Sequence, residues 1–142
     1  MSDVKQKILE VLQRGHGFLA SLATVNEEGT PWVRYLMGTI GDDMAIRFAT
    51  SLHSKKIAHV RANPKVHLTC GNIDPSLSAP YFQIEGTAEV STDLEEKKGI
   101  WHDDLAYYFQ TVDNPEWCVL KVHPHRITVC SLTSTDTEVW QK

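Results

Sequence analysis

FLASLATVNEEGTPWVRYLMGTIGDDMAIRFAT, residues 18–50, carries the clearest structural signal in this chain. It contains three runs of apolar and β-branched residues, at 18–25, 31–40 and 44–50, which are separated by the polar segments NEEG (26–29) and GDD (41–43). Strand-forming runs joined by such short Gly- and Asp-containing segments are typical of consecutive antiparallel strands. Residues 18–50 therefore predict an antiparallel meander.

Outward from the meander, the same strand pattern returns four times, which gives about seven strands. The later strands are predicted at 66–72, 81–90, 117–122 and 126–132. His123-Pro124-His125 separates the last two, and we expect a bend there. Helices are predicted from Asp3 to Gly15, at 55–63 with Ser54 as its cap, and at 92–109 with a break or bend at Gly99. This order predicts one domain over residues 1–142: a mainly β, closed or nearly closed antiparallel barrel with peripheral helices.

Composition excludes several classes of partner. The 14 Lys and Arg against 18 Asp and Glu leave a net charge of −4, so we expect neither nucleic acid nor an anionic membrane surface as a partner. The N-terminus has no apolar run typical of a signal peptide or an anchor. Three cysteines without CxxC spacing favour reduced core thiols, and hence a cytoplasmic protein.

Two short motifs predict no chemistry. Residues 15–20, GHGFLA, match the dinucleotide fingerprint, but here a helix precedes the glycines and a strand follows, which is the reverse of the required order. We interpret the glycines as a helix stop and a strand entry. His123 and His125 lack a third ligand at recognisable spacing, so no metal site is predicted.

The segment TSLHSKK (50–56) is the strongest candidate for a binding site. Thr50, Ser51 and Ser54 supply three hydroxyls, while Lys55 and Lys56 place two cations in the first turn of a predicted helix. Cations there oppose the positive end of the helix dipole, and a bound phosphate would remove that conflict. The alternative is two flexible lysines pointing into water.

Arg34 extends this candidate site. It interrupts the apolar run VRYLM, and the GDD turn folds its strand back toward residues 44–50, so that Arg34 can approach Thr50. A guanidinium in such a run needs a partner, and phosphate accepts its paired donors. A neighbouring Asp or Glu is the alternative partner.

Three blocks of sequence resemble one family. They are ATVNEEGTPWVRYL (23–36), RFATSLHSKKIAHVRANPKVHLTC (47–70), and the region from YFQIEGTAEV (81–90) through YYFQTVDNPEWCVLKVHP (107–124). In this order they resemble the pyridoxamine 5′-phosphate oxidase-related FMN-binding split barrels, especially the general-stress-protein branch. The most specific feature is the Thr, Ser and basic pair of residues 50–56, followed by Asn63-Pro64.

The resemblance implies an FMN cofactor and a homodimer with the flavin at its interface. It implies that phosphate is held by the residues already singled out, and that the ring lies along the strand near Tyr35 and Leu36. Side chains from the second subunit are expected to reach the ring, and the candidates are Gln83, Trp101 and Trp140.

Two departures from the family pattern argue against pyridoxal phosphate synthesis. A lysine five residues after the strand arginine is here Thr39, and the chain ends TEVWQK (137–142) in place of an Arg-x-His-x-Arg motif. We therefore expect an FMN-dependent oxidoreductase or flavin reductase acting on a small-molecule redox substrate, and no residue stands out as catalytic. The alternatives are a flavin-binding or sensing module without turnover, and a split barrel that uses deazaflavin or haem.

Overall fold

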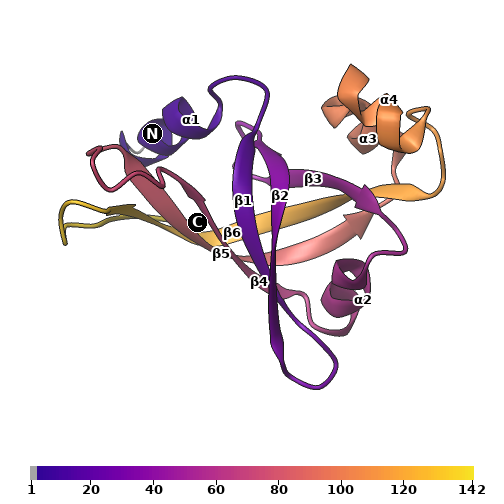
Figure 1. Cartoon of the computed structure of the whole chain (residues 1–142), viewed down its shortest axis with the longest axis horizontal. Helices are drawn as coiled ribbons and strands as arrows, with labels where there is room; N and C mark the ends of the chain where they lie inside the picture. The colour runs from indigo at the N-terminus through magenta and orange to yellow at the C-terminus, as the bar shows by residue number, and fades with distance from the viewer. Residues whose placement is uncertain (1–2) are drawn as a thin grey trace.

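Among residues 3–142, seven antiparallel strands form one sheet that closes on itself (Figure 1). The computed structural model describes residues 3–142. The strands are β1 (Phe18–Val25), β2 (Pro31–Ile40), β3 (Ile46–Ser51), β4 (Lys65–Gly71), β5 (Pro80–Ser91), β6 (Trp117–Ser131) and β7 (Glu138–Gln141). Their order in the sheet is β3-β2-β1-β4-β5-β6-β7, and an additional β3–β6 pairing closes the first six into a barrel. The predicted barrel is confirmed.

In the part of the chain that the structure describes, four helices lie outside the barrel. They are α1 (Asp3–Leu12), α2 (Lys55–Ala62), α3 (Leu94–Ile100) and α4 (Asp103–Phe109). In Figure 1, α1 lies at the end of the barrel near β7, while α3 and α4 lie at the opposite end, and α2 lies below β3. Within residues 3–142, none of the helices has the length and apolar character that crossing a bilayer requires.

The barrel interior is filled by the inward-facing side chains of alternate strand positions. Leu22, Phe48, Leu68 and Phe82 are fully buried there, as strand alternation requires when one face of a sheet packs on a core. Ile8 and Leu12 from α1 belong to the same apolar cluster. Gly38 is needed where β2 meets β3, because a Cβ there would lie 2.6 Å from Cε1 of Phe48.

Two predictions about the strands were wrong. His123-Pro124-His125 is not a bend, because β6 runs through it as one long strand with a register shift opposite Glu85 and Gly86. The extra residue forms a bulge in the strand, so no second turn is needed. Likewise β3 begins at Ile46, since Met44 adopts a φ of 70° in the preceding turn.

The predicted helix at 92–109 is two helices. The chain breaks at Trp101 and His102, two residues beyond the predicted position, and Gly99 remains helical. Asp103 and Asp104 then open the first turn of α4, where acidic side chains favour a new helix start. Strand β7 was not predicted at all, because its four residues carry no alternating pattern.

The glycine motif and the cysteines agree with the sequence analysis. Gly15 follows α1 with a φ of 71°, and β1 starts three residues later. Cys70, Cys118 and Cys130 are buried and form no disulfide. Burial raises the pKa of Cys70 to about 12 and that of Cys118 to about 11, so neither thiol is an activated nucleophile.

Candidate functional site

The end of β3 and the start of α2 bring hydroxyls and cations together. Lys56 Nζ donates a hydrogen bond of 2.9 Å to Thr50 Oγ1, and the Thr50 and Ser54 hydroxyl oxygens are 3.5 Å apart. Thr50 is buried, whereas Lys56 is half-buried and Lys55 is exposed. The Lys55 ammonium lies over the Trp32 ring, 5.0 Å from its centroid. The proposed binding segment therefore has two cations, and one of them is held in place by a buried threonine.

Arg34 joins these residues from β2. Its strand pairs with β3 only between residues 38–40 and 46–48, so Arg34 reaches the cluster from the β1 side, where it is paired with Leu22. Burial lowers the pKa of Arg34. Burial and, second, the charge of Arg34 lower the pKa of Lys56, so the two cations lie close enough to repel each other.

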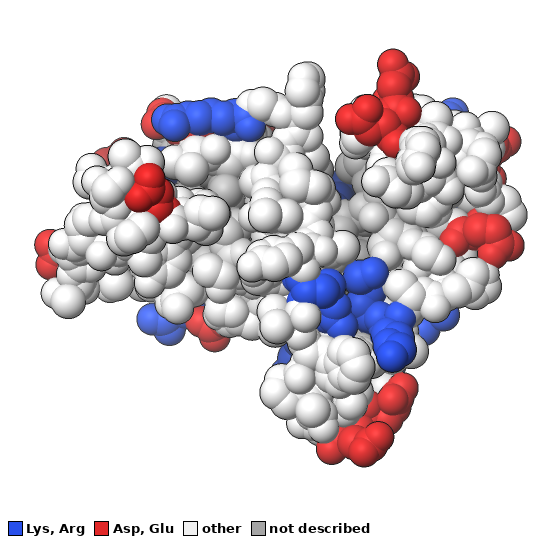
Figure 2. All heavy atoms as spheres, in the orientation of Figure 1, with Lys and Arg blue, Asp and Glu red and all other residues white. Residues whose placement is uncertain are grey.

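We call Arg34, Thr50, Ser54, Lys55 and Lys56 the basic cluster. Figure 2 shows basic side chains gathered in the region where α2 meets the barrel. Within residues 3–142, none of the three cations forms an ion pair with a carboxylate, so the alternative of an Asp or Glu partner for Arg34 is wrong. The cluster is an uncompensated positive site, to which an anion would be attracted.

Ser54 occupies the N-cap position of α2 but does not cap it. Its side chain makes no capping hydrogen bond and instead donates to the Ser51 carbonyl at 2.9 Å. The Ser51 hydroxyl accepts from the His53 backbone N–H at 3.1 Å. The predicted side-chain cap was wrong because the Ser54 hydroxyl is turned toward the Ser51 carbonyl of the preceding loop. The first-turn N–H groups of α2 are thus left without a side-chain acceptor, as an anion site requires.

The proposed ring contacts lie elsewhere on the barrel. Tyr35 is 74% exposed on the outer face of β2, while Leu36 is partly buried against the core. Tyr35, Ser21, Thr69 and Gln83 are paired in one line across β2, β1, β4 and β5. Gln83 therefore shares the outer face of Tyr35 but lies three strands away.

Neither tryptophan joins the basic cluster within one chain. Trp140 lies on β7, where it is paired with Ile127 and packs partly buried against the core. Trp101 follows α3 and packs against Trp117, with 5.7 Å between ring centroids. The structure therefore unites five of the predicted residues and leaves Gln83, Trp101 and Trp140 apart from them.

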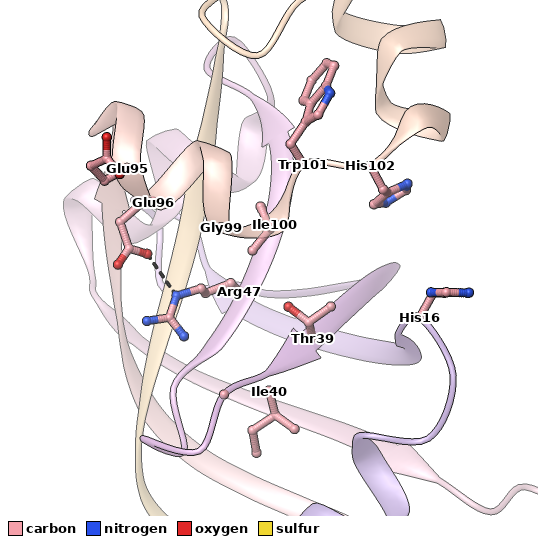
Figure 3. A pocket seen from close by; sticks show the side chains of 11 residues that line it. His16, Thr39, Ile40, Arg47, Glu95, Glu96, Gly99, Ile100, Trp101 and His102 are labelled. Carbon is pink, nitrogen blue, oxygen red and sulfur yellow. Dashed lines mark hydrogen bonds and ion pairs between the residues drawn. The ribbon is translucent and has the colours of Figure 1, made fainter.

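Trp101 borders a cavity, shown in Figure 3, that lies away from the basic cluster. This cavity of about 470 Å³ lies between α3, the last residues of β2 and the start of β3. On one side Arg47 Nε donates to Glu96 at 2.8 Å, and on the other lie the imidazoles of His16 and His102. The Arg47–Glu96 ion pair lowers the pKa of the Glu96 carboxyl. The positive charge of Arg47 in the wall of this cavity is thus paired with a carboxylate, whereas, among the described residues, the cations of the basic cluster are not.

Three residues beside Arg34 were missed in the sequence. Arg34 Nη1 donates to Thr24 Oγ1 at 2.7 Å, and Thr24 Oγ1 lies 2.8 Å from Nδ1 of His59. Trp32 packs edge-on against His59. One signal was available: His59 lies four residues after Lys55, on the same face of a predicted helix.

The sequence of the chain matches one known protein family over most of its length. The profile of the family described as "Pyridoxamine 5′-phosphate oxidase" matches residues 4–131. The chain belongs to the pyridoxamine 5′-phosphate oxidase family. It is 34% identical to General stress protein 26 of Bacillus subtilis (strain 168) over 125 residues, which are 88% of this chain and 86% of that protein. The resemblance to the general-stress-protein branch is confirmed.

Solved structures in and around the pyridoxamine 5′-phosphate oxidase family share the fold. General Stress Protein 26 from Bacillus anthracis str. Sterne superposes with a TM-score of 0.83 at 26% identity, covering 99% of this chain and 100% of that one. A pyridoxamine 5′-phosphate oxidase-related, FMN binding protein from Nostoc punctiforme PCC 73102 gives 0.76 at 16% identity, with 100% and 97% covered. A heme binding protein from Mycobacterium smegmatis also gives 0.76, at 15% identity, covering 99% of this chain and 59% of that one.

Proposed function

We propose that this chain is an FMN-binding flavoprotein whose basic cluster holds the phosphate of the cofactor. The observation that carries the proposal is the set of three cations, Arg34, Lys55 and Lys56, beside two hydroxyls and an uncapped helix start. A phosphate dianion would accept from all of these donors and cancel the repulsion between Arg34 and Lys56. The FMN-binding relative of the same fold supports this choice of cofactor.

Bound flavin would supply hydride or electron transfer, and the residues of the chain would bind and orient it. Tyr35 and Leu36 directly follow Arg34, so a ring extending from the phosphate along β2 would lie beside them. We infer an oxidoreductase acting on a small-molecule redox substrate, and not a pyridoxal phosphate synthase, because Thr39 stands where the family oxidases have a lysine.

We also propose that the flavin lies between two copies of the chain. The outer face of β1 and β2 presents apolar side chains to solvent, with Leu19, Val33, Tyr35 and Met37 between 51% and 74% exposed. Such a contiguous apolar face favours an interface, and Gln83, Trp101 and Trp140 are our candidates for flavin contacts from the second subunit. The homodimer is expected to be cytoplasmic.

The absorption spectrum of the purified protein tests the cofactor directly. We expect the flavin spectrum, and we expect FMN to raise the melting temperature far more than riboflavin does. At a ligand concentration about 100-fold above Kd, binding adds about 2.7 kcal/mol of stability, which is on the order of 5–10 °C for a domain of this size. Equal shifts from FMN and riboflavin would refute the phosphate assignment.

The same spectrum separates the alternative cofactors, and turnover separates the alternative functions. A Soret band would instead assign haem, the ligand of the mycobacterial structural relative. A deazaflavin spectrum would identify deazaflavin as the cofactor in place of FMN, and the basic cluster would still be a phosphate site. Steady NAD(P)H oxidation by the FMN-loaded protein with an added acceptor would support an oxidoreductase. Tight FMN binding without turnover across a panel of donors would support a binding or sensing module.

A further inference from the structure

A buried polar pair lies directly behind Arg34. Thr24 from β1 is 1% exposed and His59 from α2 is 5% exposed, and Thr24 Oγ1 is 2.8 Å from His59 Nδ1. Arg34 Nη1 donates to the same Thr24 oxygen at 2.7 Å and to the Leu22 carbonyl at 3.2 Å. Arg34 Nη2 lies 3.5 Å from His59 Nδ1. The buried side chains of Thr24 and His59 therefore both contact the Arg34 guanidinium.

The chemistry of these groups fixes the direction of each hydrogen bond. A guanidinium has donors only, so Thr24 Oγ1 accepts from Arg34. Arg34 Nη2, which can only donate, lies 3.5 Å from Nδ1 of His59, so Nδ1 is an acceptor and the Thr24 hydroxyl donates its hydrogen to it. An accepting Nδ1 belongs to a neutral imidazole that carries its hydrogen on Nε2. The sequence of donors and acceptors runs from Arg34 through Thr24 to His59.

This arrangement orients Arg34 without neutralising it. A carboxylate in the place of His59 would pair with the guanidinium and compete with a bound anion for its charge. The hydroxyl, the carbonyl and the neutral imidazole fix the guanidinium while its full positive charge stays available on the side of Lys56. Within residues 3–142, Arg34 forms no ion pair that would cancel this charge.

We propose that Thr24 and His59 are positioning residues for phosphate recognition, which hold Arg34 through neutral acceptors so that its charge is reserved for a phosphate monoester. The proposal rests on the proposed function, since the phosphate is that of FMN. It goes beyond it by assigning a role to two side chains that need not touch the ligand, and by requiring that the position of His59 be uncharged.

The isosteric pair His59→Asn and His59→Asp tests this requirement. Asn keeps a neutral oxygen acceptor near the position of Nδ1, whereas Asp has the same shape and adds a negative charge beside Arg34. The quantity measured is the ratio of the Kd for riboflavin to the Kd for FMN, which isolates the phosphate contribution. We expect His59→Asn to keep this ratio within about 3-fold of wild type and His59→Asp to reduce it by on the order of tenfold or more.

The melting temperature of each ligand-free variant is measured in parallel, because a purely structural role of His59 predicts a different ranking of the two variants. An Asp paired with Arg34 is expected to leave the melting temperature of the ligand-free protein at or above that of His59→Asn, although FMN is bound less tightly. If both variants lose stability together and keep the wild-type affinity ratio, the positioning role is wrong. Thr24→Val and Thr24→Ser provide a second test if either His59 variant does not fold: Val should reduce the ratio and Ser should restore it.

One readout is independent of the flavin. The imidazole nitrogen shifts of His59 in ligand-free protein, measured by NMR near neutral pH, should report the neutral ring with its hydrogen on Nε2. A hydrogen on Nδ1 would overturn the proposed direction of the hydrogen bonds. If wild type binds riboflavin and FMN equally while His59 shows the expected tautomer, the proposed function fails and the positioning of Arg34 stands. If wild type prefers FMN and His59→Asp keeps that preference, the positioning role fails alone.

Discussion

Replacing Lys55 and Lys56 by alanine should separate the roles of these lysines in the ligand-free and the FMN-bound protein. Without ligand, both oppose the dipole of α2, at a cost of about 0.3–1 kcal/mol each, and Lys56 is further destabilised by burial and by Arg34. Two contacts act in the other direction. Lys56 donates to the buried Thr50 hydroxyl, worth about 1 kcal/mol, and Lys55 stacks over Trp32, worth about 0.5–1 kcal/mol.

These terms nearly cancel, so the free energy of unfolding of the ligand-free double variant should stay within about 1 kcal/mol of wild type. FMN binding has no such cancellation. Each charge-assisted contact to phosphate that is lost should weaken binding by about 1.5–3 kcal/mol, a rise in Kd of roughly 10- to 150-fold. The effect of Lys56→Ala alone should exceed that of Lys55→Ala, because Lys56 is half-buried and held by Thr50, whereas Lys55 is exposed.

Lys5→Ala is the matched control. Lys5 lies in the first turn of α1, so its removal changes the charge and the helix dipole interaction as either single lysine substitution does, at a site far from the basic cluster (Figure 1). Thermal unfolding without ligand and FMN titration are measured on all variants, at low and at high salt. The reasoning is refuted if the double variant loses more than about 2 kcal/mol of ligand-free stability while its FMN affinity equals that of Lys5→Ala.

Three further predictions concern the interface, the core and the pH dependence of stability. Tyr35→Arg places a charge on the proposed dimer face and should shift sedimentation toward the monomer, and an unchanged dimer would exclude this face. Gly38→Ala should destabilise the barrel by about 1–3 kcal/mol, because its Cβ would overlap the Phe48 ring, whereas the control Gly99→Ala, in open space on a helix, should be stabilising by up to about 1 kcal/mol in thermal unfolding. The depressed pKa of Glu96 adds stability that is present above its unfolded pKa, near 4.5, and is lost as pH falls through the lower folded value. Glu96→Gln should therefore show a smaller loss of stability than wild type in acid unfolding curves, and equal losses would contradict this.

The barrel and the basic cluster were predictable because their signals are local. Alternating apolar runs and short turns define the meander, and the hydroxyls and lysines of residues 50–56 are neighbours in the chain. Arg34 was also identified, although the route by which it reaches the cluster was not, since its pairing with β1 depends on the sheet order. The continuous β6 was missed because its bulge needs a partner strand that a local pattern does not contain.

The residues behind Arg34 were missed for a related reason. Thr24 looks like an ordinary strand residue and His59 like an ordinary helix residue, and only their meeting in the folded chain gives them a common partner. The failed cap at Ser54 is similar, because the loop geometry turns its hydroxyl toward the Ser51 carbonyl and away from the first N–H groups of α2. Contacts of this kind follow from tertiary structure, not from sequence pattern.

The pairing of β3 with β6 has a consequence for how the protein folds. Thr50 lies opposite Cys118 on this pairing, which joins segments far apart in the chain. Contacts of such large sequence separation form late and slowly. During synthesis, β3 can pair with β6 only after β6 has left the ribosome. Thr50 and the lysine it holds take their final positions only when this seam closes. Uptake of flavin during refolding should therefore follow the slowest phase of barrel formation and serve as a kinetic reporter of the last step.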